Sequence, residues 1–145
     1  MNSRTLENLP RWATELLRDS AVARLGLTDD DGAPRVLPVT FALHGHCVWS
    51  AIDRKPKRDP GREPARVRWL RARPRAALTV DHYEDDWDAL AWVQVLGAVD
   101  VVEGAAATGA LAALAHKYPQ YLDQPPPGPV LRLVPARALW WSAAR

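Results

Sequence analysis

The chain of 145 residues has very little cysteine and histidine, and each scarcity excludes a class of site. Its single cysteine, Cys47, excludes an intrachain disulfide framework and a zinc site built from cysteines. The four histidines show no metal-ligand spacing beyond His44-Gly45-His46, a run more typical of a turn, so we predict no metal site.

Long apolar runs are missing too. None is long enough to cross a membrane, and the N-terminal residues lack the apolar block of a signal peptide. We therefore expect a cytoplasmic protein with no membrane partner.

Lysine is scarce in a different way, because the chain has sixteen arginines but only three lysines. Two of the lysines stand together in Arg54-Lys55-Pro56-Lys57-Arg58, directly after the apolar run 48–52. An ammonium is a compact point charge for a phosphate, whereas a guanidinium is a planar fork. The pattern predicts a phosphate-binding loop at a strand end, and the alternative interpretation is a solvated hairpin tip without a ligand.

The charge pattern gives little support to a nucleic-acid partner. The formal net charge is +2, with basic residues gathered in 54–75 and acidic residues in 81–88. Aromatic residues that could stack on bases do not alternate with the basic stretch, so we expect no nucleic acid.

Hydrophobic residues make up 48% of the chain, enough for one domain over residues 1–145 with a core of its own. Helices are predicted outside the sheet, from Pro10 to Asp19 and over 65–73 and 105–117. Strands are predicted over 22–28, 36–43, 47–52, 76–83, 90–103 and within 130–142.

The predicted strands follow one another along the chain rather than alternating with helices. The predicted fold class is therefore mainly β (α+β), an antiparallel barrel of about six strands with about three peripheral helices. The first three strands are predicted to form a meander, and Gly97 is predicted to mark a bend in the long strand.

Several motifs, in order, resemble those of one family. They are Gly26-Leu27-Thr28 through Asp31-Gly32-Ala33-Pro34 to Pro38-Val39, then Asp53-Arg54-Lys55-Pro56-Lys57-Arg58, then Pro74-Arg75-Ala76 through Val80-Asp81-His82-Tyr83 to Asp86-Trp87, and Lys117-Tyr118-Pro119-Gln120-Tyr121. Over nearly the whole chain they resemble the split-barrel flavin and deazaflavin reductases. These are relatives of pyridoxamine 5′-phosphate oxidase, and the likeness is to the branch that uses the deazaflavin coenzyme F420.

This resemblance implies an FMN-binding-like split β-barrel and a homodimer with the cofactor in a groove between subunits. It implies a cofactor site from three groups of residues: Lys55 and Lys57 at the phosphate with Arg54 or Arg58 beside them; Ser50, Ala51 and Ile52 along the ring; and Pro38, Val39 and Thr40 near its polar edge. In this family the loop usually runs straight into a helix, whereas here Pro60, Gly61 and Pro64 interrupt it.

The implied activity is hydride transfer between reduced F420 and an unsaturated small molecule. No side chain is predicted to be catalytic, because the deazaflavin supplies the hydride and the protein holds donor and acceptor in contact. Trp87 and Trp92 are candidates for the substrate wall, from the partner subunit, and His82 for a proton donor. Packing roles are the alternative for all three.

Two further functions stay open on the sequence. One keeps the fold and replaces F420 with FMN, as in a pyridoxamine-phosphate-oxidase-like flavoprotein. The other is a protein that binds or stores a cofactor or haem without turnover, although no histidine is well placed as an axial ligand.

Overall fold

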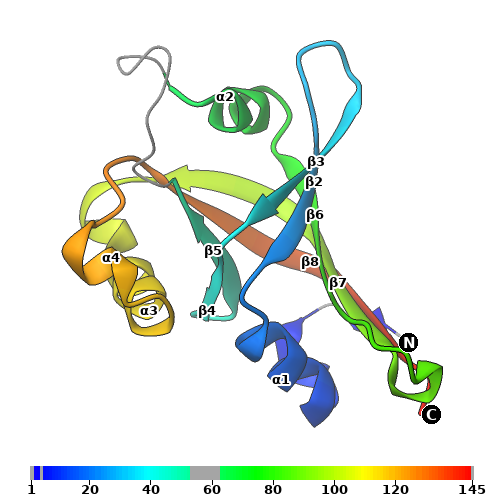
Figure 1. Cartoon of the computed structure of the whole chain (residues 1–145). Helices are drawn as coiled ribbons and strands as arrows, with labels where there is room; N and C mark the ends of the chain where they lie inside the picture. The colour runs from blue at the N-terminus through cyan, green and yellow to red at the C-terminus, as the bar shows by residue number, and fades with distance from the viewer. Residues whose placement is uncertain (1, 4, 53–62, 145) are drawn as a thin grey trace.

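The computed structural model describes residues 2–3, 5–52 and 63–144, which form one curved sheet with helices around it (Figure 1). The strands are β1 Asn2–Ser3, β2 Ala23–Thr28, β3 Pro34–Val39, β4 Ala42–His44, β5 Cys47–Ala51, β6 Arg75–His82, β7 Ala91–Val102 and β8 Val130–Ser142. The α-helices are α1 Arg11–Asp19, α2 Ala65–Ala72, α3 Thr108–Lys117 and α4 Gln120–Asp123. Short 3₁₀ helices are η1 Leu6–Asn8, η2 Trp87–Ala89 and η3 Gly104–Ala107.

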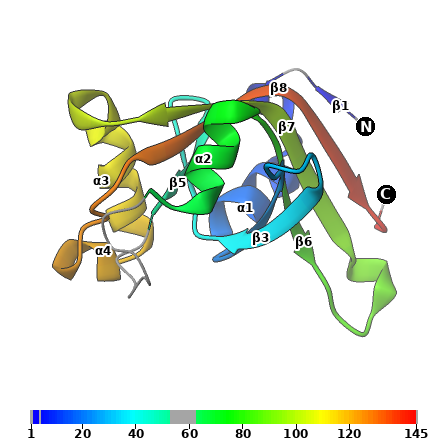
Figure 2. The same cartoon turned by 90° about the horizontal axis from the view of Figure 1, so that it is seen from above.

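The sheet is a barrel that is split between β3 and β4. Its strands follow the antiparallel order β3-β2-β6-β7-β8-β5-β4. The short β1 pairs with β8, and Figure 2 shows the two side by side. β3 and β4 stand at opposite ends of this order, yet only Thr40 and Phe41 separate them in the chain. Because consecutive Cα atoms are about 3.8 Å apart, the three steps from Val39 to Ala42 span at most about 11 Å. The two edges of the sheet therefore approach each other at this two-residue crossover.

Two expectations are corrected by this topology. The predicted single strand 36–43 is two strands, and the predicted meander over 22–52 is wrong, because β3 pairs with β2 while β4 pairs with β5. The counts of about six strands and three helices are also too low for the described residues. The additional β1 and α4 have two and four residues, too short to produce a hydrophobic period.

Three helices, α1, α2 and α3, pack their apolar faces on the sheet. α1 packs on β6 and β7 through Ala13 and Leu17, which are fully buried one turn apart. α2 packs on β2 and β7, and α3 packs on β4 and β5, where Leu114 joins Trp49 in a second apolar cluster. The first cluster holds Phe41, the largest fully buried side chain of the described residues.

The predicted irregularity at Gly97 is confirmed. The β7–β8 register shifts there, with Leu96 opposite Arg137 and Gly97 opposite Pro135, which leaves Ala136 as the extra residue of β8. Such a bulge bends the two longest strands together and helps to curl the sheet.

Candidate functional site

The crossover between β3 and β4 meets the end of β5 directly. Ser50, at 6% exposure, donates a hydrogen bond of 2.6 Å from its Oγ to the Thr40 carbonyl oxygen. The two strand ends that the resemblance assigns to the ring of a cofactor therefore lie side by side. Immediately after β5 the chain enters the lysine segment, where Lys55, Lys57, Arg54 and Arg58 all lie outside the described residues.

Two tyrosines hold this crossover from the other side. The Phe41 N–H donates to the Tyr118 hydroxyl oxygen at 3.1 Å, and the same hydroxyl has two carbonyl oxygens in reach of its proton, Phe41 at 3.0 Å and Ala21 at 2.8 Å. The Tyr121 hydroxyl lies 2.6 Å from Thr40 Oγ1. The Lys117–Tyr121 run, quoted above only for its resemblance, thus has a physical role. That role was missed because the partners of the two tyrosines are 77 to 97 residues away in sequence.

We expect Tyr118→Phe to destabilise the fold by about 1–2 kcal/mol, because the Phe41 N–H loses its acceptor in a partly buried place. Urea unfolding of both proteins measures this difference. Tyr83→Phe is the control, since Tyr83 is 67% exposed and its replacement should change stability by less than about 0.5 kcal/mol. Equal effects of the two substitutions would show that the Tyr118 hydroxyl does not hold the crossover.

Lys117 places a buried ammonium against the same crossover. Its Nζ lies 3.7 Å from the centroid of the Phe41 ring and, within the part of the chain that the structure describes, has no hydrogen-bond acceptor. Burial lowers the pKa of Lys117 to about 8, and the Asp19 carboxylate acts in the opposite direction. The Phe41 ring face attracts the cation and offsets part of the cost of desolvation.

The pH dependence of stability should reveal this lysine. The pKa of Lys117 is about 8 in the folded protein, below the ordinary value of 10.5. Between pH 8 and pH 10.5 the unfolded chain therefore binds more protons than the folded chain. The free energy of unfolding rises with pH over this range. Lys117→Met should therefore be more stable than wild type at pH 7, by about 1 kcal/mol after allowance for solvent around a half-buried group. Urea unfolding at pH 7, 9 and 10.5 should show this advantage shrinking as pH rises. An advantage independent of pH would contradict a desolvated ammonium.

The predicted ring-lining residues have buried side chains. Ser50, Ala51 and Ile52 are each at most 6% exposed, and Ile52 packs on the backbone at Gly128. On β3, Val39 is buried and Pro38 is exposed, and Thr40, which follows the strand, is half-buried. A flat ligand at this place would meet mainly the backbone of the β5 end and the exposed side of Pro38.

A cation that the sequence did not single out lies beside this strand end. Arg66, in the first turn of α2, brings its Nη2 to 3.5 Å from the Ala51 carbonyl oxygen. The basic stretch 54–75 contains Arg66 and was the available signal, but its many arginines did not show which one reaches β5.

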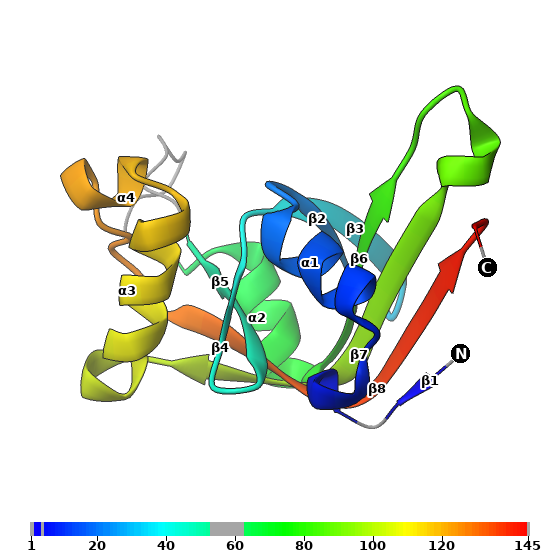
Figure 3. The ribbon, with the colours of Figure 1, turned by 90° about the horizontal axis from the view of Figure 1, so that it is seen from below.

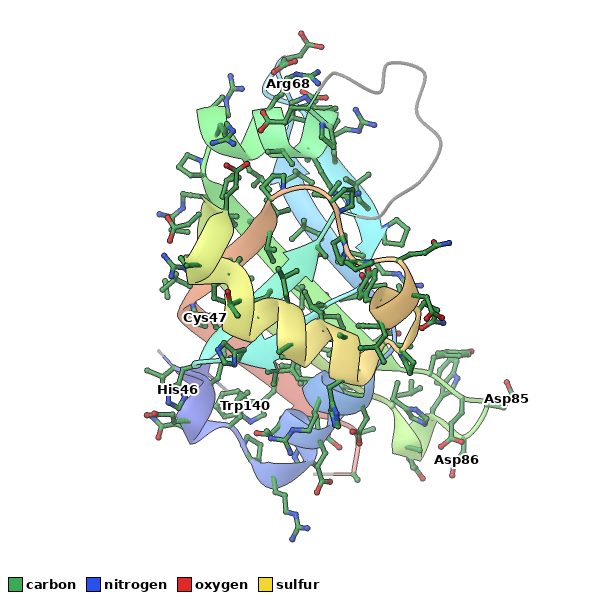
Figure 4. The ribbon with its side chains drawn as sticks, turned by 90° about the vertical axis from the view of Figure 1, so that its left-hand side faces the viewer. His46, Cys47, Arg68, Asp85, Asp86 and Trp140 are labelled. Carbon is green, nitrogen blue, oxygen red and sulfur yellow. The ribbon has the colours of Figure 1, made fainter. Side chains whose placement is uncertain are left out.

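The aromatic candidates lie elsewhere, in and beside the β6–β7 hairpin. Trp87, in η2 of the β6–β7 hairpin, is 68% exposed. Figure 4 shows the neighbouring Asp85 and Asp86 in this projecting hairpin, far from Arg68 on α2. No contact joins Trp87 to Ser50 among the described residues, and Trp92 is the second residue of β7, next to the same hairpin. The His82 ring is 3.4 Å from the Glu84 carboxylate there.

The described residues give little support to a metal site or to a reactive thiol. No group of three His, Cys, Asp or Glu side chains among residues 2–3, 5–52 and 63–144 is arranged to hold a metal ion. Burial raises the pKa of Cys47, which disfavours the reactive thiolate. No helix in the described part of the chain is both long enough and apolar enough to cross a membrane.

No family model and no curated protein matches this sequence, but solved structures match its fold. A haem-binding protein from Mycobacterium smegmatis has a TM-score of 0.70 at 23% identity, over 92% of this chain and 55% of its own. A FAD-binding protein from Mesorhizobium loti has a TM-score of 0.68 at 18% identity, over 97% and 95% of the two chains. An F420 reductase has a TM-score of 0.66 at 21% identity, over 92% and 98%.

These neighbours have the split-barrel fold of the flavin and deazaflavin reductases, and the chain shares that fold. Their names give three different cofactor chemistries, and a likeness at such identities shows the fold alone.

Proposed function

We propose that the protein is a homodimeric F420-dependent reductase that passes a hydride to an unsaturated small molecule. The observation that carries this proposal is the hydrogen bond between Ser50 and Thr40. It joins the two strand ends implied for the cofactor ring, at the point where the chain enters its paired lysines. An F420 reductase among the solved structures of this fold adds support.

The residues at the ends of β3 and β5 fit a cofactor that has a flat ring and an anionic tail. Pro38 offers an exposed apolar surface and the ends of β3 and β5 offer backbone groups, which suit a flat heterocycle. Arg66 beside Ala51 places one cation near the start of the lysine segment, as a phosphorylated tail requires. Lys55 and Lys57, with Arg54 or Arg58, would supply the remaining positive charge.

The residues of this chain would bind and orient rather than react. When bound, reduced F420 supplies the hydride, and the acceptor takes up a proton to complete the reduction. Ser50 and Tyr121 hold Thr40 in place, so the crossover presents a fixed edge to the ring. Trp87, exposed at the far end of one protomer, would wall the acceptor side of the partner's groove.

Two competing functions are separated by one titration series. A FAD-binding neighbour favours the FMN alternative, and a haem-binding neighbour favours storage without turnover. Each of F420, FMN and haemin is titrated into the purified protein, with tryptophan fluorescence as the readout and Soret absorbance in addition for haemin. We expect micromolar or tighter binding of F420 and much weaker binding of FMN. Tight FMN binding without a response to F420 would overturn the choice of cofactor.

Turnover needs a separate measurement. Reduced F420 bound to the protein is mixed with a panel of conjugated enones and nitroaromatics, and its oxidation is followed by absorbance. Acceleration over free reduced F420 supports a reductase, and its absence with every acceptor, despite tight binding, supports a carrier. Sedimentation at several concentrations tests the homodimer, and a monomer that binds F420 fully would contradict a site shared between subunits.

A further inference from the structure

A second candidate site involves α1 and the β6–β7 hairpin, two elements that Figure 3 shows. An open cavity of about 420 Å³ is bounded there by α1, the end of β6, the start of β7 and the end of β8. Its volume falls within the range of small-molecule sites. The described residues implied for the F420 ring, at the ends of β3 and β5, do not line this cavity, although His82, the candidate proton donor, does.

The lining combines carboxylates with apolar surface. Two acidic residues one turn apart on α1, Glu15 and Asp19, line the cavity, and Trp12 and Leu16 on the same helix are half-buried lining residues. The other lining residues are His82, Ser142 and three alanines. None of the described residues that line the cavity is lysine or arginine, in a chain that carries nineteen of them.

Two cations lie close by without closing the cavity. Arg11 bonds Glu15 at 2.8 Å, but its side chain is 92% exposed and this pair lies on the surface of one helix, so a competing cation displaces it at little cost. The Lys117 ammonium acts on Asp19 but is turned against the Phe41 ring. The carboxylates therefore stay available to a ligand.

We propose that this cavity binds an organic cation with a flat apolar body, an arylalkyl amine in chemical class. The ammonium group would pair with Glu15 and Asp19, while the ring packs against Trp12 and Leu16. Such a ligand contacts both the acidic and the apolar residues of the lining, whereas the two carboxylates repel an anionic ligand of the same shape.

Calorimetric titration of the full chain with tryptamine tests the proposal, at low ionic strength where exposed ion pairs are least screened. Tryptophol has the same indole and side chain with a neutral hydroxyl in place of the ammonium, and indole-3-propionate has an anion there. We expect tryptamine to bind at least about fivefold more tightly than tryptophol, and indole-3-propionate not to bind. Equal affinity for tryptamine and tryptophol, or no binding of tryptamine at millimolar concentration, would overturn the proposal.

Variants locate the interaction. Glu15→Gln with Asp19→Asn should reduce tryptamine affinity to that of tryptophol while leaving F420 affinity unchanged. Asp30→Asn with Asp31→Asn is the matched control, because it also removes two negative charges and both residues are exposed between β2 and β3, outside the cavity. An equal loss from this control would show a net-charge effect and would refute the site. Because the tryptamine titration needs no F420, its result stands whether or not the reductase proposal fails.

Discussion

Gly97→Ala should cost the fold about 3 kcal/mol or more, the largest loss of stability that we expect from a single methyl group in this protein. A Cβ at Gly97 would lie 1.9 Å from the Val134 carbonyl oxygen and 2.9 Å from its carbonyl carbon. Both atoms are backbone of β8, so no side chain can rotate away. To admit the methyl group, the strands must separate at the bulge where Gly97 faces Pro135.

Urea unfolding measures this loss, and Gly26→Ala is its control. Gly26 is also a strand glycine, but its Cβ would come no closer than 3.6 Å to the Ala77 carbonyl oxygen, which is an ordinary contact. Since alanine loses less backbone entropy than glycine on folding, Gly26→Ala should be neutral or stabilising by up to about 1 kcal/mol. If Gly97→Ala were as well tolerated as Gly26→Ala, the close approach of β7 and β8 at Gly97 would be wrong.

The sequence predicted those features that depend on local patterns. Alternating and continuous apolar runs gave β2, β5, β6 and β7 nearly to their ends, and the apolar face of α1 gave that helix. Gly97 was recognisable because a glycine within a long strand commonly marks a bulge or a close backbone approach. These predictions needed no knowledge of how distant segments pack.

Apart from the very short β1 and α4, the main features that the sequence did not predict depend on distant contacts. Residues 36–43 read as one strand, because the apolar pattern continues through Thr40 and Phe41. At the crossover the Phe41 N–H is bonded to Tyr118 and the Thr40 carbonyl oxygen to Ser50, so these backbone groups do not pair with a neighbouring strand. The same limit applies to Ser50, whose hydrogen bond to the Thr40 carbonyl oxygen joins residues ten positions apart and follows from no local pattern.

Lys57→Ala should weaken the binding of F420 by roughly 1.5–3 kcal/mol, about tenfold to more than a hundredfold in dissociation constant. Lys57 lies outside the described residues, so this prediction depends on the resemblance and on the place where the chain leaves β5, next to Ser50 and Arg66. A charge-assisted contact to a phosphate would be lost, and no other charge nearby is removed.

Fluorescence titration of the variant, at low and at high salt, separates a direct contact from a general change in charge. Arg18→Ala is the control, since Arg18 is exposed in the last turn of α1 and its removal changes the net charge equally. A general effect of net charge would weaken F420 binding in both variants at low salt. It would disappear in 1 M salt, where the field of a charge is screened beyond about 3 Å. A direct contact would lower the affinity in Lys57→Ala alone and would persist in part at high salt, because a phosphate held at the ammonium is closer than the screening distance. An unchanged dissociation constant for Lys57→Ala would remove this lysine from the cofactor site and leave Lys55 and Arg66 as the cations to test.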